Sequence, residues 1–310
     1  MSPREFPKGN MLHSRSLACP ALVALVLVLG GGCTTTTRTA DSSSSHLTYL
    51  ISDGQPDYGN RYPTVVQVST PNGACSGVLI KPKLALTAAH CFCFPATRGA
   101  RKVYRYKKSG AVGEIGLTCA DKAGVTAILY PQDEGKEPQA LPPRTKTRQG
   151  SVQVHPGYEF TTDAEGDVIY SRMDLAAVHL EGPLTANADT RLPTQEVQPQ
   201  ESLVAVGYGF TAVGPPSTRH FGTNKVMDIN ISIGGDGIFA FRGSDDRGRG
   251  AHAWKGDSGG PCFREDKDGR RWLVGIISTG RVIDGKPISG FTSTFHHREW
   301  INSQMEISTR

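Results

Sequence analysis

Apolar residues in this chain occur in short runs, and clusters rich in glycine, proline and polar residues separate them. Such runs lie, for example, at residues 77–80, 84–86, 204–206 and 275–277. Short apolar runs with frequent turns predict an all-β fold of many short strands rather than a helical bundle. Near the end of the chain, the apolar spacing and the charges of about residues 296–305 predict a short helix.

The first 32 residues have the form of a signal peptide. The apolar run at residues 21–29 follows basic residues and is too short to span a bilayer comfortably. Three glycines and Cys33 follow it, which resembles a bacterial lipoprotein processing site, although the branched apolar residue lies four rather than three positions before the cysteine. We predict that residues 1–32 are removed and that Cys33 carries a lipid. Ordinary signal cleavage and an uncleaved anchor remain as alternatives.

Residues 33–50 contain a run of four threonines and a run of four serines, which predict a flexible polar tether. The folded domain is therefore expected to span residues 51–310. About 260 residues are enough for one large domain or for two small ones packed together. The formal net charge of +5 is spread along the chain, and this pattern does not predict a nucleic-acid partner.

Three segments combine a reactive residue with a strongly patterned neighbourhood. Residues 87–91 read Thr-Ala-Ala-His-Cys and contain His90, residues 174–180 begin with Asp174, and residues 256–261 read Gly-Asp-Ser-Gly-Gly-Pro around Ser258. A serine hydroxyl is a poor nucleophile at neutral pH and needs a base within hydrogen-bond reach. With this order of His, Asp and Ser, the chain resembles the chymotrypsin-like (trypsin-fold) serine proteases over about residues 51–304.

The resemblance implies a fold of two antiparallel six-stranded β-barrels with the active site between them. The first barrel is expected over about residues 64–180, the second over about 200–295, and the closing helix over about 296–305. Residues 204–211 resemble the family's strand that opens the second barrel, and residues 275–280 resemble the strand that lines the substrate cleft. Residues 122–149 are rich in charge and proline, and we predict an extended surface loop there.

The resemblance also implies the catalytic roles. His90 would take the proton of Ser258 and return it to the leaving group, while Asp174 would fix the imidazole tautomer. The amides of Gly256 and Ser258 would form the oxyanion hole, because the glycines around Ser258 allow a tight turn. No cofactor and no metal are expected.

Cysteine usage fits an exported chain, in which disulfides can form. The resemblance implies a disulfide between Cys75 and Cys91, beside the catalytic histidine. Of the remaining cysteines, Cys93 and Cys119 are the more local pair and would leave Cys262 unpaired, but the sequence does not settle this connectivity.

Residues 51–54 resemble the mature N-terminus of these proteases, in which a new isoleucine amine pairs with the aspartate before the catalytic serine. The corresponding residues here are Ile51 and Asp257, and such a buried pair acts as a switch. The preceding residue is Leu50 rather than the usual arginine or lysine. One hypothesis is that another protease cleaves after Leu50, which activates the domain and frees it from its tether. The alternative is a variant that is active without this cleavage.

The position six before Ser258 is His252, where trypsin-like members carry an aspartate, so a basic P1 residue is not predicted. His252 and Lys255 suggest the hypothesis of an acidic or polar P1 residue, unless both are solvated. The residues that we place near the substrate are His252, Ala253, Lys255, Ser278, Thr279, Gly280 and Gly290.

These features predict a serine endopeptidase, an exported monomer that is either a cell-envelope lipoprotein or secreted. Its partners would be protein or peptide substrates and an activating protease, and it would contact a membrane through the lipid anchor alone. Two alternatives belong to other classes. One is a catalytically silent relative that acts as a binding module. The other is an esterase or acyl transferase, although the strand–helix context of a Gly-x-Ser-x-Gly elbow is missing.

Overall fold

The computed structural model describes residues 51–52, 54–71, 73–95, 102–106, 114–132, 141–166, 168–185, 190–209, 218–227, 237–242, 250–283 and 285–308. The predicted signal peptide, the lipidation site Cys33 and the tether lie outside these residues, so they stay predictions. Among the described residues, no helix has the length and apolar character that crossing a membrane requires.

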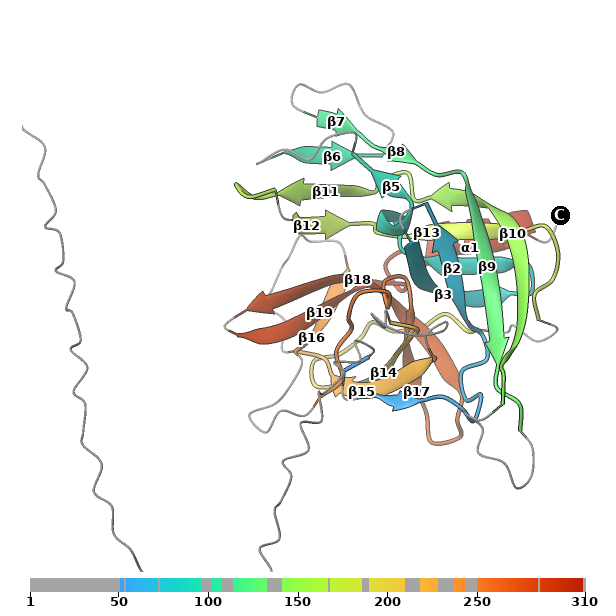
Figure 1. Ribbon diagram of the computed structural model, residues 1–310. Coiled ribbons are helices and arrows are strands. Elements are labelled where there is room, and N and C mark those ends of the chain that lie inside the picture. Colours follow the sequence, from blue (N-terminus) through green and yellow to red (C-terminus); the bar gives the residue numbers. More distant parts are fainter. Residues whose placement is uncertain are drawn as a thin grey trace, which may run out of the picture. The chain divides into compact units, whose positions relative to one another are not determined.

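The first half of the domain is a closed antiparallel barrel (Figure 1). Its strands follow one another in the order β10-β13-β4-β3-β2-β9, which confirms a six-stranded antiparallel barrel. Side chains that point inward supply the core, such as those of Val66, Val78 and Val178, all fully buried. The strands are β2 (Val65–Thr70), β3 (Gly73–Lys81), β4 (Leu84–Thr87), β9 (Lys122–Leu129), β10 (Arg144–Val154) and β13 (Ala176–Leu180).

The surface loop predicted for residues 122–149 is wrong, because much of this segment forms the paired strands β9 and β10 of the barrel. Buried and half-buried residues alternate along most of β9, and most of the charged and polar side chains of β10 are exposed. The charges that suggested a loop therefore lie on the solvent face of a hairpin. Pro131, Pro142 and Pro143 fall outside both strands, where they remove no ladder hydrogen bond.

The second half is a curved sheet of seven strands rather than the predicted six. The additional strand is β1 (Gln55–Pro56), which pairs with the edge of β15. A single bridge between Val226 and Phe241 connects the end of β15 with β16 across the sheet. The order is β1-β15-β14-β17-β18-β19-β16, with β14 (Ser202–Gly207), β15 (His220–Lys225), β16 (Ile238–Arg242), β17 (Pro261–Glu265), β18 (Arg271–Ile283) and β19 (Lys286–Ser293).

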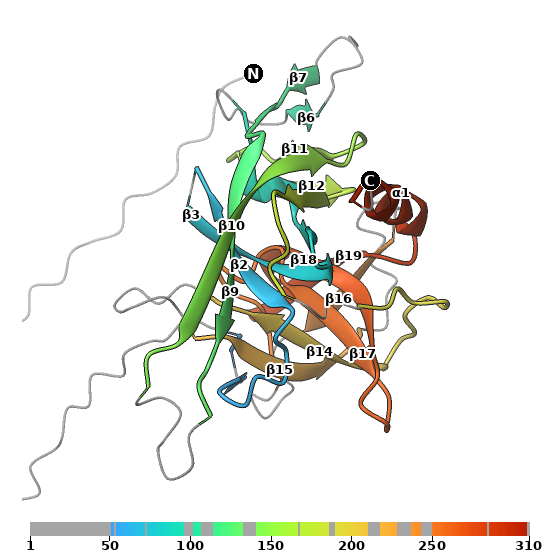
Figure 2. The same cartoon turned by 90° about the vertical axis from the view of Figure 1, so that its right-hand side faces the viewer.

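Smaller elements flank the barrel. A four-stranded sheet has the order β12-β11-β6-β7, with β6 (Val103–Arg105), β7 (Glu114–Gly116), β11 (Glu159–Thr162) and β12 (Val168–Arg172). β5 (Cys93–Phe94) pairs with β8 (Thr118–Cys119). The helix α1 (Arg298–Ser308) lies at the end of the chain (Figure 2), where its core positions Ile301 and Gln304 are buried. It begins two residues later and ends three residues later than predicted.

A buried ion pair connects the two halves. Arg219 and Asp57 are both fully or almost fully buried, with 2.7 Å between Nε and Oδ2. The guanidinium also donates hydrogen bonds to the carbonyl of Ile128 on β9 (3.0 Å) and to the hydroxyl of Tyr208 (3.1 Å). A buried charge pair is tolerated when its remaining donors are satisfied in this way. The network fixes the segment that follows Ile51 against both halves.

Candidate active site

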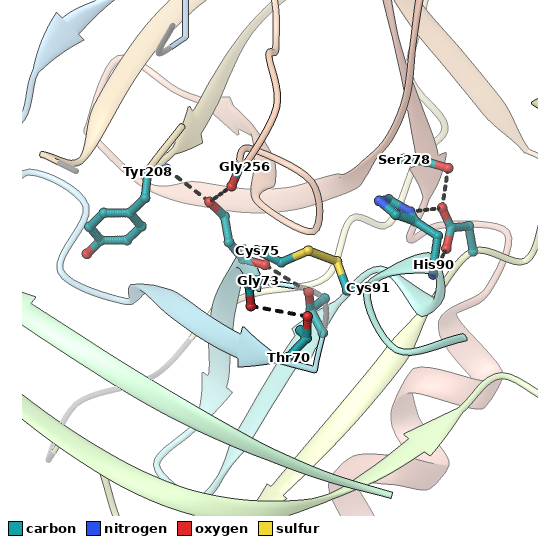
Figure 3. Close-up of a disulfide and its surroundings, with 11 residues drawn as sticks. Thr70, Gly73, Cys75, His90, Cys91, Tyr208, Gly256 and Ser278 are labelled. Carbon is teal, nitrogen blue, oxygen red and sulfur yellow. Dashed lines mark hydrogen bonds and ion pairs between the residues drawn. A yellow bond between two sulfur atoms is a disulfide. The ribbon is translucent and has the colours of Figure 1, made fainter. Parts of the chain in front are cut away.

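His90 and Asp174 form a hydrogen-bonded pair on the first barrel. His90 lies on the short 3-10 helix η1 (Ala89–Cys91), directly after β4, and Asp174 lies just before β13. The backbone N–H of His90 donates to Oδ1 of Asp174 (2.8 Å), and its ring Nδ1 lies 2.7 Å from Oδ2. Ser278 Oγ, from β18, donates to the same Oδ2 (2.6 Å; Figure 3). The carboxylate of Asp174 is 1% exposed, and these contacts hold it in a single orientation.

The backbone before Asp174 is held in an uncommon conformation. Met173 has a φ of 50°, in the left-handed region that residues other than glycine rarely adopt. The Leu175 N–H donates to the Met173 carbonyl (2.8 Å) across this turn. Strain of this kind persists where surrounding contacts impose it and is concentrated at functional sites.

The electrostatics of the pair follow from burial and from mutual charge. Burial alone would lower the pKa of His90, but the charge of Asp174 and the hydrogen bond to it raise that pKa above 6.5. Burial acts to raise the pKa of Asp174, but the charge of His90 and the hydrogen bonds from His90 and Ser278 lower it below the usual value. Asp174 is therefore a carboxylate at neutral pH. His90 carries its proton on Nδ1 when it donates to that carboxylate, which leaves Nε2 as the basic nitrogen.

Ser258 lies in a tight turn that requires glycine. Gly256 and Gly259 have φ values of 90° and 81°. A Cβ atom on Gly259 would collide with the Thr87 hydroxyl and with the carbonyl of Ser76. The glycines around Ser258 thus serve both the turn and the close approach of the second sheet to the first barrel.

One cleft brings the predicted catalytic residues together. It has a volume of about 390 Å³, and His90, Asp174, Gly256 and Ser258 are among the residues that line it. The cleft also runs along Phe160 and other residues of the flanking sheet. A cavity of this size falls within the range of small-ligand sites.

A second cavity, of about 320 Å³, adjoins the cleft at Ser258. Five of the seven residues predicted near the substrate line it, namely Ala253, Lys255, Ser278, Thr279 and Gly280. The other two do not appear among the described residues that line either cavity. His252 instead forms a β-bridge with Ser52, and Gly290 pairs with Thr279 in the β18–β19 hairpin.

Sequence reasoning missed most of the other residues of the second cavity. Two of them, Trp254 (38% exposed) and Val282 (69% exposed), are large apolar side chains open to solvent. The signal for these residues is the long antiparallel hairpin of β18 and β19. The strand that lines the cleft at Gly280 continues past this residue, so the residues that follow can line the cavity as well. The missed residues are Trp254, Arg281, Val282, Pro287 and Ile288, whereas Ile277 belongs to the strand that the sequence predicted to line the cleft.

Two disulfides stiffen the region of His90. Cys75 on β3 is bonded to Cys91 of η1 (Figure 3), and Cys93 is bonded to Cys119. Cys262 is buried and free. Cys75, His90 and Cys91 offer their ligand atoms close together, but both sulfurs belong to the disulfide and are not free to bind a metal.

The two residues of the predicted activation switch are both buried. Ile51 is 2% exposed, and the backbone of the next residue, Ser52, pairs with His252. The carboxyl of Asp257 accepts hydrogen bonds from the N–H groups of Gly209 (2.8 Å) and Trp254 (2.9 Å). Burial raises the pKa of Asp257 to about 7. Within the described part of the chain, no cationic side chain pairs with this carboxyl.

The closed barrel, the second sheet and the His90–Asp174 pair define the class of trypsin-like serine protease folds. The family model described as Trypsin matches residues 51–115 and 136–301, and the chain belongs to this family.

Three relatives show how distant the matches are. Phenoloxidase-activating factor 3 of Holotrichia diomphalia is 26% identical over 297 residues, which cover 84% of this chain and 73% of the relative. The venom peptide isomerase heavy chain of Agelenopsis aperta is 21% identical over 270 residues, covering 79% and 95%. A trypsin-like protease of Streptomyces glaucescens is 24% identical over 253 residues, covering 78% and 76%.

Proposed function

We propose that the chain is a serine endopeptidase that hydrolyses peptide bonds through an acyl-enzyme, with His90, Asp174 and Ser258 as its catalytic triad. The observation that carries this proposal is the His90–Asp174 pair, which lines the same cleft as Ser258 and the glycine turn. Family membership supports the same reaction class.

The chemistry assigns each group one task. His90 Nε2 accepts the proton of Ser258 Oγ as this oxygen attacks the substrate carbonyl, and then gives the proton to the leaving amine. Asp174 holds the imidazole in the required tautomer and stabilises the imidazolium that forms. The amides of Gly256 and Ser258 stabilise the oxyanion. Water then attacks the acyl-enzyme. His90 again accepts the proton and then returns it to Ser258 Oγ.

The edge of β18 supports binding of an extended peptide. β17 pairs with β18 up to Ile276, and β19 covers the opposite edge from Gly275 to Ile283. In the described part of the sheet, residues 278–280 therefore have no partner strand on the side that β17 leaves open. A substrate backbone can add there as a further strand, which places the scissile carbonyl beside Ser258.

The second cavity supports a large apolar P1 side chain. Its walls include Ile277, Pro287 and Ile288, and no carboxylate is among the described residues that line it. Lys255 is exposed, and Arg281 donates a hydrogen bond to the carbonyl of Val168 on β12 (2.7 Å). Burying a charged P1 group against apolar walls costs free energy unless it is paired. We therefore propose Leu, Met, Phe or Tyr at P1 in place of the acidic or polar residue suggested by the sequence.

Narrowing this cavity is expected to change the P1 preference. A Cβ atom on Gly280 would meet no atom within 4 Å, so Gly280→Val fits the fold but fills part of the cavity. We expect kcat/KM for Phe at P1 to fall roughly 10- to 100-fold relative to Ala at P1. Gly59→Val makes the same change at an exposed turn with equally open space, and we expect it to leave this ratio unchanged. A wild-type preference for Arg, Lys, Asp or Glu would contradict the proposal.

We further propose that cleavage after Leu50 activates the domain. The new ammonium of Ile51 would give the buried carboxyl of Asp257 the cationic partner that it lacks, and would fix the turn before Ser258. The support is the burial of both residues and the pairing of Ser52 with His252.

The disulfides support export to an oxidising compartment.

Peptide hydrolysis by two forms of the chain tests both proposals. The full chain and a form that begins at Ile51 are incubated with a denatured protein, and new peptide termini are detected by mass spectrometry. We expect cleavage by the Ile51 form and much slower cleavage by the full chain. An active species whose N-terminus is Cys33, or another residue well before Ile51, would refute the activation step. No cleavage by either form would favour the catalytically silent binding module.

A further inference from the structure

Ser76 connects the first barrel to the turn that carries Ser258. It lies on β3 and is fully buried. Its backbone N–H donates to the carbonyl of Ser258 (2.8 Å), and its hydroxyl donates to the carbonyl of Gly256 (2.9 Å). The same hydroxyl accepts the N–H of Tyr208 (2.9 Å), and the dashed lines at Gly256 and Tyr208 in Figure 3 mark these two hydrogen bonds. The single O–H donor of Ser76 is thus used on the turn.

The same residue is connected to the segment that holds His90. The carbonyl of Ser76 accepts a hydrogen bond from the hydroxyl of Thr87 (2.8 Å), the last residue of β4. The residue before Ser76 is Cys75, which is disulfide-bonded to Cys91, the residue after His90. Two adjacent residues of β3 therefore hold both the base and the nucleophile of the proposed triad.

We propose that Ser76 is a positioning residue that sets the orientation of the oxyanion turn relative to His90. The inference rests on the proposed function of that turn. Ser76 holds the carbonyls of Gly256 and Ser258, and the amides of these two residues are the proposed oxyanion donors. Without the hydroxyl, the carbonyl of Gly256 loses this donor and the buried N–H of Tyr208 loses its acceptor. Unpaired buried polar groups cost free energy, so the backbone at Gly256 and at Tyr208 must then shift until both groups find other partners.

Kinetics of Ser76→Ala test the proposal. A small displacement of catalytic groups or the loss of an oxyanion donor is costly, so we expect kcat to fall about 10- to 100-fold with KM nearly unchanged. Ser76→Thr keeps the hydroxyl and is expected to retain most of the wild-type kcat. Ser293→Ala is the matched control, because Ser293 is also buried, lies outside the cleft, and has no hydrogen-bond partner for its hydroxyl in the described part of the chain. An unchanged kcat in Ser76→Ala, or an equal fall in Ser293→Ala, would overturn the proposal.

Amide hydrogen exchange tests the same contact without any need for activity. The amide of Tyr208 is expected to exchange faster in Ser76→Ala than in the wild type, and at the wild-type rate in Ser293→Ala. Equal exchange in all three would show that the hydroxyl does not hold Tyr208, and the proposal would fail. If the wild-type protein hydrolyses no peptide, the proposed function fails, while the exchange rates still decide the role of the hydroxyl. Ser76→Gly replaces Ser76→Ala if that variant does not fold, with the same expected results.

Discussion

Replacing Ser258 with alanine is expected to lower kcat/KM for peptide hydrolysis by about 10⁶-fold, because the attacking oxygen disappears and only the binding and oxyanion contributions remain. The backbone carbonyl of Ser258 accepts the N–H of Ser76, and alanine keeps that contact. The variant should therefore fold and bind substrate like the wild type. Initial rates with a chromogenic peptide that carries Phe at P1 measure the change.

The matched control for this change is Ser151→Ala, because Ser151 is an exposed residue of β10 on the first barrel. We expect the control to keep the wild-type rate. A Ser258→Ala variant that retains hydrolysis within tenfold of the wild type would show that another group is the nucleophile, and the proposed mechanism would be wrong.

Asp174→Asn is expected to lower kcat/KM by about 10⁴-fold, as the matching change does in serine proteases with this triad. Both oxygens of Asp174 accept hydrogen bonds, from the backbone and ring of His90 and from Ser278. An asparagine side chain has one acceptor oxygen and one NH₂ donor group. When the NH₂ group faces the ring, Nδ1 must accept its hydrogen bond, so the imidazole carries its proton on Nε2 and offers no lone pair to Ser258.

The same variant should shift the pH dependence. His90 must be neutral to act as a base, so the rate falls as the pH drops through its pKa, which the charge of Asp174 raises above 6.5 in the wild type. The asparagine side chain of the variant carries no charge, and the burial of the ring would then lower this pKa. The half-maximal point of the acidic limb is expected at lower pH in Asp174→Asn. A limb at the same or higher pH would mean that Asp174 does not control His90.

The sequence indicated the three residues of the proposed triad because each lies in a local motif, and the structure places all three along one cleft. His90 follows a strand and precedes a cysteine, and the glycines around Ser258 are required by positive φ angles and by the contact with Thr87. The preceding strand and the positive φ angles are short-range constraints, so they leave a trace in neighbouring residues. The six-stranded barrel was predictable from resemblance and from short apolar runs.

Features that depend on distant residues could not be predicted. Asp57 and Arg219 are 162 positions apart, and an arginine that is fully buried looks like a surface residue in the sequence. The edge strand β1 depends on the same anchoring of the segment after Ile51. The strands β9 and β10 were interpreted as a loop because charged side chains on one exposed face resemble the composition of a loop. The spacing from Ser258 predicts His252 near the substrate, but His252 is not among the described residues that line either cavity, and its backbone pairs with Ser52.

The most direct test of a serine nucleophile in this cleft is covalent labelling with a fluorophosphonate probe. The full chain and the form that begins at Ile51 are treated with the probe beside the Ser258→Ala variant of each, and the labelled peptide is mapped by mass spectrometry. We expect labelling of the Ile51 form at Ser258, and no labelling of its Ser258→Ala variant. Failure of both wild-type forms to react, or labelling at another residue, would contradict the proposal.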